Sequence, residues 1–259
     1  MPDASQWLPK LRTAVEPDGV RILESHLTKS NVWQFYVSTL PPVSPPQIVR
    51  SIKGRLQNLI RVSHPSVFRR NFHLCSVGDA TAAVVEQYVN SQLGHHRMAD
   101  PLVQQELRDF QHDFSDVNVT ARRLAAHGVY SYALHLVLVH DGRWNVVRRD
   151  ALSRSRDMVF RVAQVKQHCV SRLAVLCDHL HLVAGIPPIQ SPQEVALAYL
   201  NNLAFAHGMQ ALFQSGYYAG TLGTYDTGAI WSSLRPRVGD NECDASNSPD
   251  QPRASGAPD

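Results

Sequence analysis

Residues 181–196, "HLVAGIPPIQSPQEVA", decide how the chain is organised, because an earlier stretch follows the same pattern. Residues 35–49, "FYVSTLPPVSPPQIV", also combine an apolar segment, a Pro-Pro step, a Ser- and Pro-rich turn and a helix start. Proline suits turns and the first position of a helix, so both stretches predict a strand, a turn and a helix. Such self-similarity predicts that one structural unit occurs twice in the chain.

The flanking segments extend this repeat. A helix-type pattern follows each copy, at 45–62 and at 191–212, and a short strand ending in glycine comes next, at 72–80 and at 217–226. Each half is therefore a strand–helix–strand unit of the α+β kind.

The two halves differ at their beginnings. The second has an extra leading strand at 130–147, with a predicted hairpin turn around Asp141-Gly142, and a helix over roughly 150–168. The first half starts abruptly and lacks a clear counterpart to that strand. Residues 93–128 join the halves and contain one predicted helix.

Composition sets the broad class of the protein. The 259 residues are 44% hydrophobic and 18% charged, as in ordinary soluble globular proteins. No apolar run approaches the ~20 residues that cross a bilayer, and the N-terminus lacks the layout of a signal peptide. The four cysteines are scattered and form no CxxC pair, which favours reduced thiols. We expect a cytoplasmic, nucleoid-associated protein.

The net charge of +3 conceals an uneven distribution. Residues 235–259 have three Arg against five Asp and Glu, and their Pro, Ser, Gly and Asp content predicts a disordered tail. Between Glu24 and Asp79 there is no acidic residue. The basic residues in that stretch are Lys29, Arg50, Lys53, Arg55, Arg61, Arg69 and Arg70. They form either a solvated basic face or a track for a polyanion.

Two histidines lie in the apolar stretch "CDHLHLVAGIPP" (177–188). In a strand, residues two apart point to the same side, so His179 and His181 can chelate one divalent ion. A third ligand has to come from elsewhere in the fold. The alternative is that both are ordinary buried histidines with satisfied hydrogen bonds. Strand alternation argues against Asp178 orienting His179, and a polar linker is a poor scaffold for His95 and His96 as ligands.

The stretch "DHLHLVAGIPP", with "LHLVLV" upstream, resembles the single-tyrosine HUH transposases of small bacterial insertion sequences and their repeat-associated relatives. In that family the strand carries His, a bulky hydrophobe and His, followed by Pro-Pro. A later helix carries one nucleophilic tyrosine and, one turn on, a Gln or other polar ligand. The resemblance covers roughly 20–92 and 130–234, and implies a ferredoxin-like, HUH-type antiparallel sheet in each half.

The second half does not supply the tyrosine. Ten residues past Gly223 the sequence has Ser233, and Tyr225 lies at the wrong position. Tyr217 and Tyr218 are predicted to be sheet residues rather than nucleophiles.

The first half supplies what the second lacks. Ten residues past Gly78 stands Tyr88, with Gln92 four residues further on and Asp79 as the expected N-cap of the helix. The positions of the two histidines are lost there, since they hold Trp33 and Phe35.

One copy thus keeps the histidines and the other keeps the tyrosine. The resemblance implies a fused pseudo-dimer of residues 1–92 and 129–234, with the linker 93–128 and the tail 235–259. Its one composite site would have Tyr88 as nucleophile and His179, His181 and Gln92 as ligands of Mg²⁺ or Mn²⁺. The second composite site would be inactive. The alternative is that Tyr88 is simply a packed helix residue.

The resemblance implies a metal-dependent single-strand DNA transesterase or nickase that forms a 5′-phosphotyrosine bond on single-stranded or hairpin DNA. The family's Lys-Gly helix feature is present as "SIKGR" (51–55), which favours Lys53, Arg55 and Arg61 as DNA contacts, with Arg50, Arg69 and Arg70 beside them. Two alternatives stay open. One is a terminal protein that caps the 5′ ends of a linear replicon at its telomeres, and the other is a non-catalytic DNA-binding protein on a domesticated transposase fold.

Overall fold

The computed structural model describes residues 3–28, 32–95, 101–143 and 147–223. It is a mixed α+β structure, as the sequence pattern predicted, with three separate sheets in these ranges. The elements in chain order are α1 (Ala4–Val15), η1 (Glu16–Asp18), β1 (Val20–Leu27), β2 (Trp33–Thr39), α2 (Pro45–Ile60), β3 (Phe72–Cys75), α3 (Ala82–Asn90), α4 (Gln92–His95), α5 (Pro101–Arg108), β4 (Gln111–Asp113), β5 (Arg123–Ala125), β6 (Gly128–Ser131), β7 (Ala133–Val139), η2 (Asp141–Arg143), α6 (Arg149–Lys166), β8 (Cys169–Val175), β9 (His179–Gly185), α7 (Pro192–Ala206) and β10 (Tyr218–Thr221).

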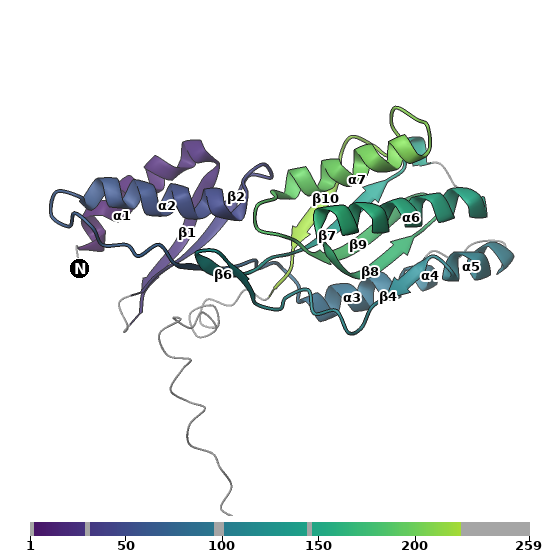
Figure 1. Cartoon of the computed structure of the whole chain (residues 1–259), viewed down its shortest axis with the longest axis horizontal. Coiled ribbons are helices and arrows are strands. Elements are labelled where there is room, and N and C mark those ends of the chain that lie inside the picture. Colours follow the sequence, from purple (N-terminus) through teal and green to yellow (C-terminus); the bar gives the residue numbers. More distant parts are fainter. Residues whose placement is uncertain (1–2, 29–31, 96–100, 144–146, 224–259) are drawn as a thin grey trace, which may run out of the picture.

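The N-terminal layer consists of α1 and α2 packed on the antiparallel pair β1–β2 (Figure 1). Trp7, Leu11 and Val15 are buried and recur every four residues, so they form one apolar stripe on α1. Leu56 and Ile60 of α2 belong to the same core. This helix α1 extends the first unit further toward the N-terminus than the sequence comparison of the two halves indicated.

The largest sheet has five antiparallel strands in the order β10-β7-β9-β8-β4. Four of these strands follow the β-α-β-β-α-β connectivity of a ferredoxin-like unit, with α6 and α7 as its helices. Both helices cover one face of this sheet (Figure 1), where Leu180 and Leu182 pack with Val159 and Tyr199. This face forms the main core.

The opposite face of the same sheet is covered by α3, a helix of the first half (Figure 1). Val89 of α3 packs there against Ala174 of β8 and Val183 of β9. Because side chains alternate along a strand, residues 179, 181 and 183 face α3, while 180 and 182 face the main core. The fold therefore places the helix of one half on the histidine strand of the other.

The halves also meet where β3 and β10 end. The Gly78 N–H donates to the Gly223 carbonyl at 2.9 Å, and the Gly223 N–H donates to the Ala80 carbonyl at 3.0 Å. The Ser76 hydroxyl donates to the Leu222 carbonyl at 3.2 Å. A Cβ at Gly78 would lie 1.8 Å from the Thr221 carbonyl oxygen, so only glycine permits this approach. The "SVG" and "TLG" ends of the two repeats thus lie against each other.

Two local features recur in both halves. The Gln47 side chain accepts from the Ser44 N–H at the start of α2, and the Glu194 side chain accepts from the Ser191 N–H at the start of α7. The pairs β1–β2 and β8–β9 are both antiparallel with one register shift near the start of the first strand. Among the described residues of the first half there is no counterpart to β7, and β3 instead pairs in parallel with β6.

Two local predictions were wrong. The hairpin at Asp141-Gly142 does not form in the described residues, because β9 and β10 already occupy both edges of β7. The N-cap of α3 is Thr81, whose side chain accepts from the Val84 N–H at 3.2 Å, and not Asp79. The expected tail, 235–259, lies outside the described residues.

Candidate active site

His179 and His181 lie on β9, on the face that α3 covers. They are 8% and 3% exposed, and their ring centroids are 4.9 Å apart with the ring planes 78° to each other. Neutral imidazole is a common ligand for divalent metals, and two rings on one strand face can share an ion. The expected side-by-side arrangement of these histidines is therefore present.

Asp178 contacts His179 directly, contrary to the expectation from strand alternation. The Nδ1 atom of His179 lies 2.6 Å from Oδ1 of Asp178. Alternation does not apply here, because β9 begins at His179 and Asp178 lies in the bend before it. A carboxylate only accepts, so it holds the His179 proton on Nδ1 and leaves the lone pair on Nε2.

His135 of β7 is a site residue that sequence reasoning missed. Its Nε2 lies 3.0 Å from Nδ1 of His181, and the residue is 6% exposed. Burial lowers the pKa of His135 to about 4, so the ring is neutral at pH 7. The apolar alternation of "ALHLVLV" predicts its face of the strand, but pairing with His181 depends on the β7–β9 register.

Tyr88 lies on α3, with its ring next to the histidines. Its centroid is 5.6 Å from that of His181 and 6.3 Å from that of His135. The side chain is 47% exposed, so solvent and substrate can reach it. The structure thus brings together Tyr88 of one half and His181 of the other, which are far apart in the sequence.

A buried arginine and its partners hold α3 on the sheet. Arg172 of β8 is 8% exposed, and its Nη1 and Nη2 lie 2.9 Å from Oδ1 of Asp113 and 3.8 Å from Oε2 of Glu86. Glu86 also accepts from the Ser171 hydroxyl at 2.6 Å, and Asn90 donates to Asp113 at 2.9 Å. Glu86 and Asn90 flank Tyr88 on α3, so this network fixes the helix that carries the tyrosine.

Gln92 follows a break between α3 and α4 rather than continuing one helix. Its side chain is 1% exposed and donates to the Tyr88 carbonyl at 3.1 Å. In this orientation the amide oxygen is the atom that could act as a ligand, and an oxygen donor suits Mg²⁺ or Mn²⁺. Gln92 is therefore tied to Tyr88, as the spacing of the two residues suggested.

The side chains of His179, His181 and Gln92 fit a divalent ion that has few protein ligands. In the ranges covered by the structure, no group of three or more His, Cys, Asp or Glu side chains could hold a metal. An ion at His179 and His181 therefore needs Gln92, water or substrate oxygens to complete its coordination. Such an open site suits phosphate binding.

Two of the basic residues are engaged inside the first half. The Lys53 ammonium donates to the carbonyls of Arg69 and Asn71, and burial lowers its pKa. Arg55 pairs with Asp18 at 3.0 Å. Lys53 thus holds the loop after α2. Arg55 is paired with Asp18, an acidic residue that precedes the acid-free stretch between Glu24 and Asp79.

The remaining arginines of the predicted DNA track are exposed. This holds for Arg50, Arg61, Arg69 and Arg70, while Lys29 lies outside the described residues. They belong to α2 and the loop after it, in the N-terminal layer (Figure 1), and not to the sheet that carries the histidines.

The corresponding strand of the first half is filled with aromatic rings. Trp33 and Phe35 stack at 6.1 Å between centroids, and Trp7 meets Trp33 edge-on at 4.8 Å. These side chains are part of the N-terminal core. Ser233, which would complete a second site, lies outside the described residues.

Most of the remaining candidate residues lie near β10 or outside the described ranges. Tyr218 lies on β10, as predicted, with its ring 5.5 Å from that of His135, and Tyr217 packs against the main core. His96 and Tyr225 lie outside the described residues. Cys75 and Cys169 are free thiols.

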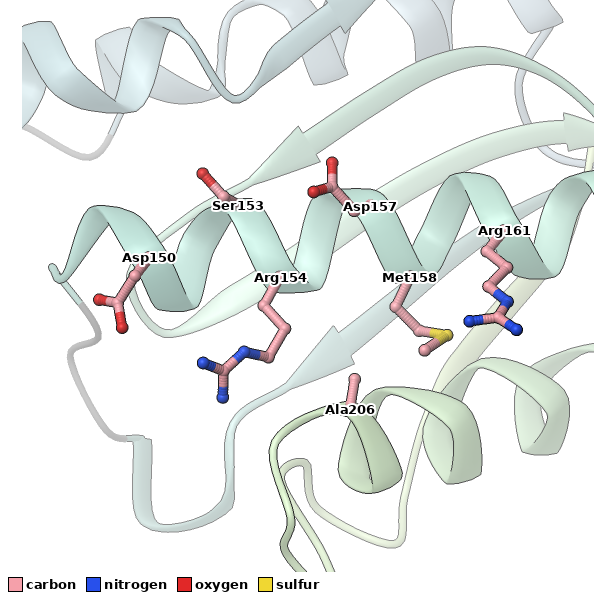
Figure 2. Close-up of a pocket in the computed structure, with 7 residues that line it drawn as sticks. All are labelled: Asp150, Ser153, Arg154, Asp157, Met158, Arg161 and Ala206. Carbon is pink, nitrogen blue, oxygen red and sulfur yellow. The ribbon is translucent and has the colours of Figure 1, made fainter.

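A shallow depression of about 480 Å³ lies on α6 and the end of α7 (Figure 2). Figure 2 shows Arg154, Arg161, Asp150 and Asp157 around it, so positive and negative charges are balanced. These helices cover the face of the sheet opposite α3, so the depression is separate from Tyr88 and the histidines. No helix within the described ranges is long and apolar enough to span a membrane.

Comparison with known proteins supports the predicted resemblance over part of the chain. Residues 5–92 match the family described as "Transposase IS200 like". Among solved structures, a REP-associated tyrosine transposase bound to a REP hairpin is similar over 39% of this chain, at 12% identity and a TM-score of 0.32. The match spans 61% of that relative's length. No curated protein matches the chain. Residues 5–92 are therefore similar to the IS200-like transposases, in agreement with the resemblance to single-tyrosine HUH transposases that the sequence motifs carry.

Proposed function

We propose that this protein is a DNA-processing transesterase with one composite active site. Tyr88 of the first half is the nucleophile, and His179 and His181 of the second half form the metal-binding side. The substrate is single-stranded or hairpin DNA. The two halves are the units 1–92 and 129–234, joined by 93–128 and followed by the tail 235–259, and they act as a fused pseudo-dimer.

The contact between Tyr88 and His181 is the observation that carries this proposal. Each half lacks one part of the site expected from the resemblance, and the ring centroids of Tyr88 and His181 are 5.6 Å apart, which supports a shared site. A tyrosine that served only for packing would not need to remain 47% exposed beside two imidazoles. The hydrogen bonds between residues 76–80 and 221–223 support the same arrangement, because they join the ends of the two repeats.

The chemistry is transfer of a phosphodiester from a DNA 3′ oxygen to a tyrosine. The Tyr88 oxygen attacks the phosphorus, the new O–P bond forms, and the bond to the 3′ oxygen breaks. The phenolic proton leaves to solvent, and the released 3′ oxygen takes up a proton. The 5′-phosphotyrosine retains a phosphodiester bond, so rejoining needs no ATP.

The residues that would hold a divalent ion are His179, His181 and Gln92. When bound, Mg²⁺ or Mn²⁺ would supply charge stabilisation for the phosphate oxygens. Asp178 orients His179 through the 2.6 Å contact to Nδ1. Burial of both histidines limits the water around them, which strengthens the interactions made there.

DNA reaches this site past the exposed side of Tyr88, and we propose that the basic residues of the first half bind its backbone. Arg50, Arg61, Arg69 and Arg70 are exposed and suited to this role. Lys53 contributes by holding the loop after α2 through the Asn71 carbonyl, and Arg55 contributes by pairing α2 with Asp18 of η1.

The test is a denaturing gel of the protein with labelled single strands and hairpins in Mn²⁺. We expect a covalent adduct with the wild-type protein that is absent in Tyr88→Phe and without metal. Tyr218→Phe is the matched comparison, because Tyr218 is the other described tyrosine whose ring lies near the histidines. Loss of the adduct in Tyr218→Phe but not in Tyr88→Phe would contradict the proposal.

The same gel separates the alternatives. An adduct that persists without rejoining would favour a terminal protein on 5′ ends, and one that reverses would favour a nickase or transposase. Tight binding without any adduct would instead favour a DNA-binding protein that has lost its chemistry.

A further inference from the structure

His135 forms a buried pair with His181 that no part of the proposed reaction uses directly. The Nε2 atom of His135 lies 3.0 Å from Nδ1 of His181, and the ring planes differ by 15°. The ring centroids are 5.3 Å apart, which is too far for face-to-face contact. Two nearly coplanar rings meeting at their nitrogen edges form an N–H···N hydrogen bond.

A hydrogen bond at this 3.0 Å distance has one proton between the two nitrogens. If His181 carries it on Nδ1, then His135 accepts and the lone pair of His181 is on Nε2. If His135 carries it, then His181 accepts on Nδ1 and its own proton is on Nε2. Only the first arrangement leaves Nε2 of His181 able to bind a cation.

We propose that His135 is a positioning residue that accepts the Nδ1 proton of His181 and so directs the Nε2 lone pair of His181 toward the metal. The inference rests on the proposed function in one respect, because the direction of that lone pair matters when His181 acts as a ligand. His135 itself touches neither the metal nor the DNA in this scheme.

The neighbouring histidine provides the first argument. His179 has the acceptor-only carboxylate of Asp178 at its Nδ1, so its lone pair is on Nε2. With His135 as an acceptor, both histidines of β9 carry the proton on Nδ1 and present the same nitrogen. A neutral histidine in water favours the proton on Nε2, so each ring needs an acceptor at Nδ1 to reach this state.

Burial provides the second argument. His135 and His181 are 6% and 3% exposed, so bulk water does not offer a replacement acceptor. His135 comes from β7, and the part of the first half that the structure describes has no counterpart to β7. The half without this supporting strand is also the half in which Trp33 and Phe35 occupy the histidine positions. The proposed histidine ligands and the strand β7, which carries His135, thus occur in the same half.

The direct test is nitrogen-15 NMR of the imidazoles in the full-length, metal-free protein, where the two ring nitrogens have distinct shifts in each tautomer. We expect His181 with its proton on Nδ1, and His135→Leu to shift His181 toward the Nε2–H form. A wild-type His181 with its proton on Nε2 would overturn the proposal, whether or not the variant folds.

Metal affinity gives a second readout, measured by electron paramagnetic resonance of Mn²⁺ without DNA. We expect His135→Leu to weaken Mn²⁺ binding about 10- to 100-fold. His135→Gln should restore most of it, because the Gln oxygen can accept at about the position of Nε2. His140→Leu is the control, since His140 is also buried but packs on Phe213. Unchanged affinity in His135→Leu would contradict the proposal.

These readouts are independent of the tyrosine. Tyr88→Phe should change neither the His181 tautomer nor Mn²⁺ affinity, while it removes the DNA adduct. A protein that forms no adduct but shows the expected tautomer and affinities would refute the proposed reaction and retain the role of His135. The opposite result would retain the reaction and refute this role.

Discussion

The strands β9 and β2 carry matching segments of the sequence repeat, but their side chains have different surroundings. In β9, His179 and His181 face α3 and have their Nδ1 atoms engaged by Asp178 and His135. In β2, Trp33 and Phe35 join the core of the N-terminal layer. The difference teaches that the same position of the repeat can hold polar or apolar side chains, depending on which elements cover the strand.

The covering elements explain which use each strand has. The face of β9 is met by α3, which leaves an exposed tyrosine beside the histidines. The face of β2 is met by α1, whose Trp7 packs edge-on against Trp33. The helix α3 of the first half therefore covers the sheet of the second half. The aromatic side chains of β2 pack against apolar residues of the N-terminal layer instead.

The largest expected effect comes from substituting one residue of β9 and one residue of β2. His181→Ala should reduce adduct formation at least about 10³-fold, because the site loses a metal ligand. Its unfolding midpoint should change little. Phe35→Ala should lower the free energy of unfolding by about 2 kcal/mol, since it removes half-buried ring contacts, and leave the chemical step nearly unchanged. Gel assays and urea titrations would measure both, and matching losses of stability in the two variants would contradict the comparison.

A smaller effect is expected from substituting one ion-paired arginine in each half. Arg172→Met should lower the free energy of unfolding by about 2–3 kcal/mol, because it removes the guanidinium that Glu86 and Asp113 contact. It should also slow adduct formation about 10- to 100-fold, because α3 loses its fixed position. Arg55→Met removes an exposed pair with Asp18 and should leave the urea midpoint unchanged. Equal adduct rates in Arg172→Met and wild type would show that the network does not position Tyr88.

Local sequence signals predicted much of this arrangement. Pro-Pro and Ser-Pro steps predicted the starts of α2 and α7, and the alternation in "HLHLVAG" predicted that the two histidines share a face. The run of helix-compatible residues after Asp79 predicted α3. The helix α1 was overlooked, although Asp3 as N-cap and the buried stripe from Trp7 to Val15 are visible in the sequence.

The rest depends on long-range pairing that one sequence does not contain. The bond between His135 and His181 follows from the register of β7 against β9. The partners of Arg172 come from α3 and β4, which are brought to β8 only by the complete fold. The contact of Asp178 with His179 depends on where β9 begins, a boundary that periodicity leaves uncertain by a residue or more.

The most direct test of the central claim is a mixing experiment with two inactive variants, Tyr88→Phe and His181→Ala. If one chain forms the whole composite site, the mixture stays inactive, because neither chain has both the tyrosine and the histidine. We predict that no covalent DNA adduct appears at any mixing ratio. Recovery of adduct in the mixture would contradict the account, since it would show that the tyrosine of one chain works with the histidines of another.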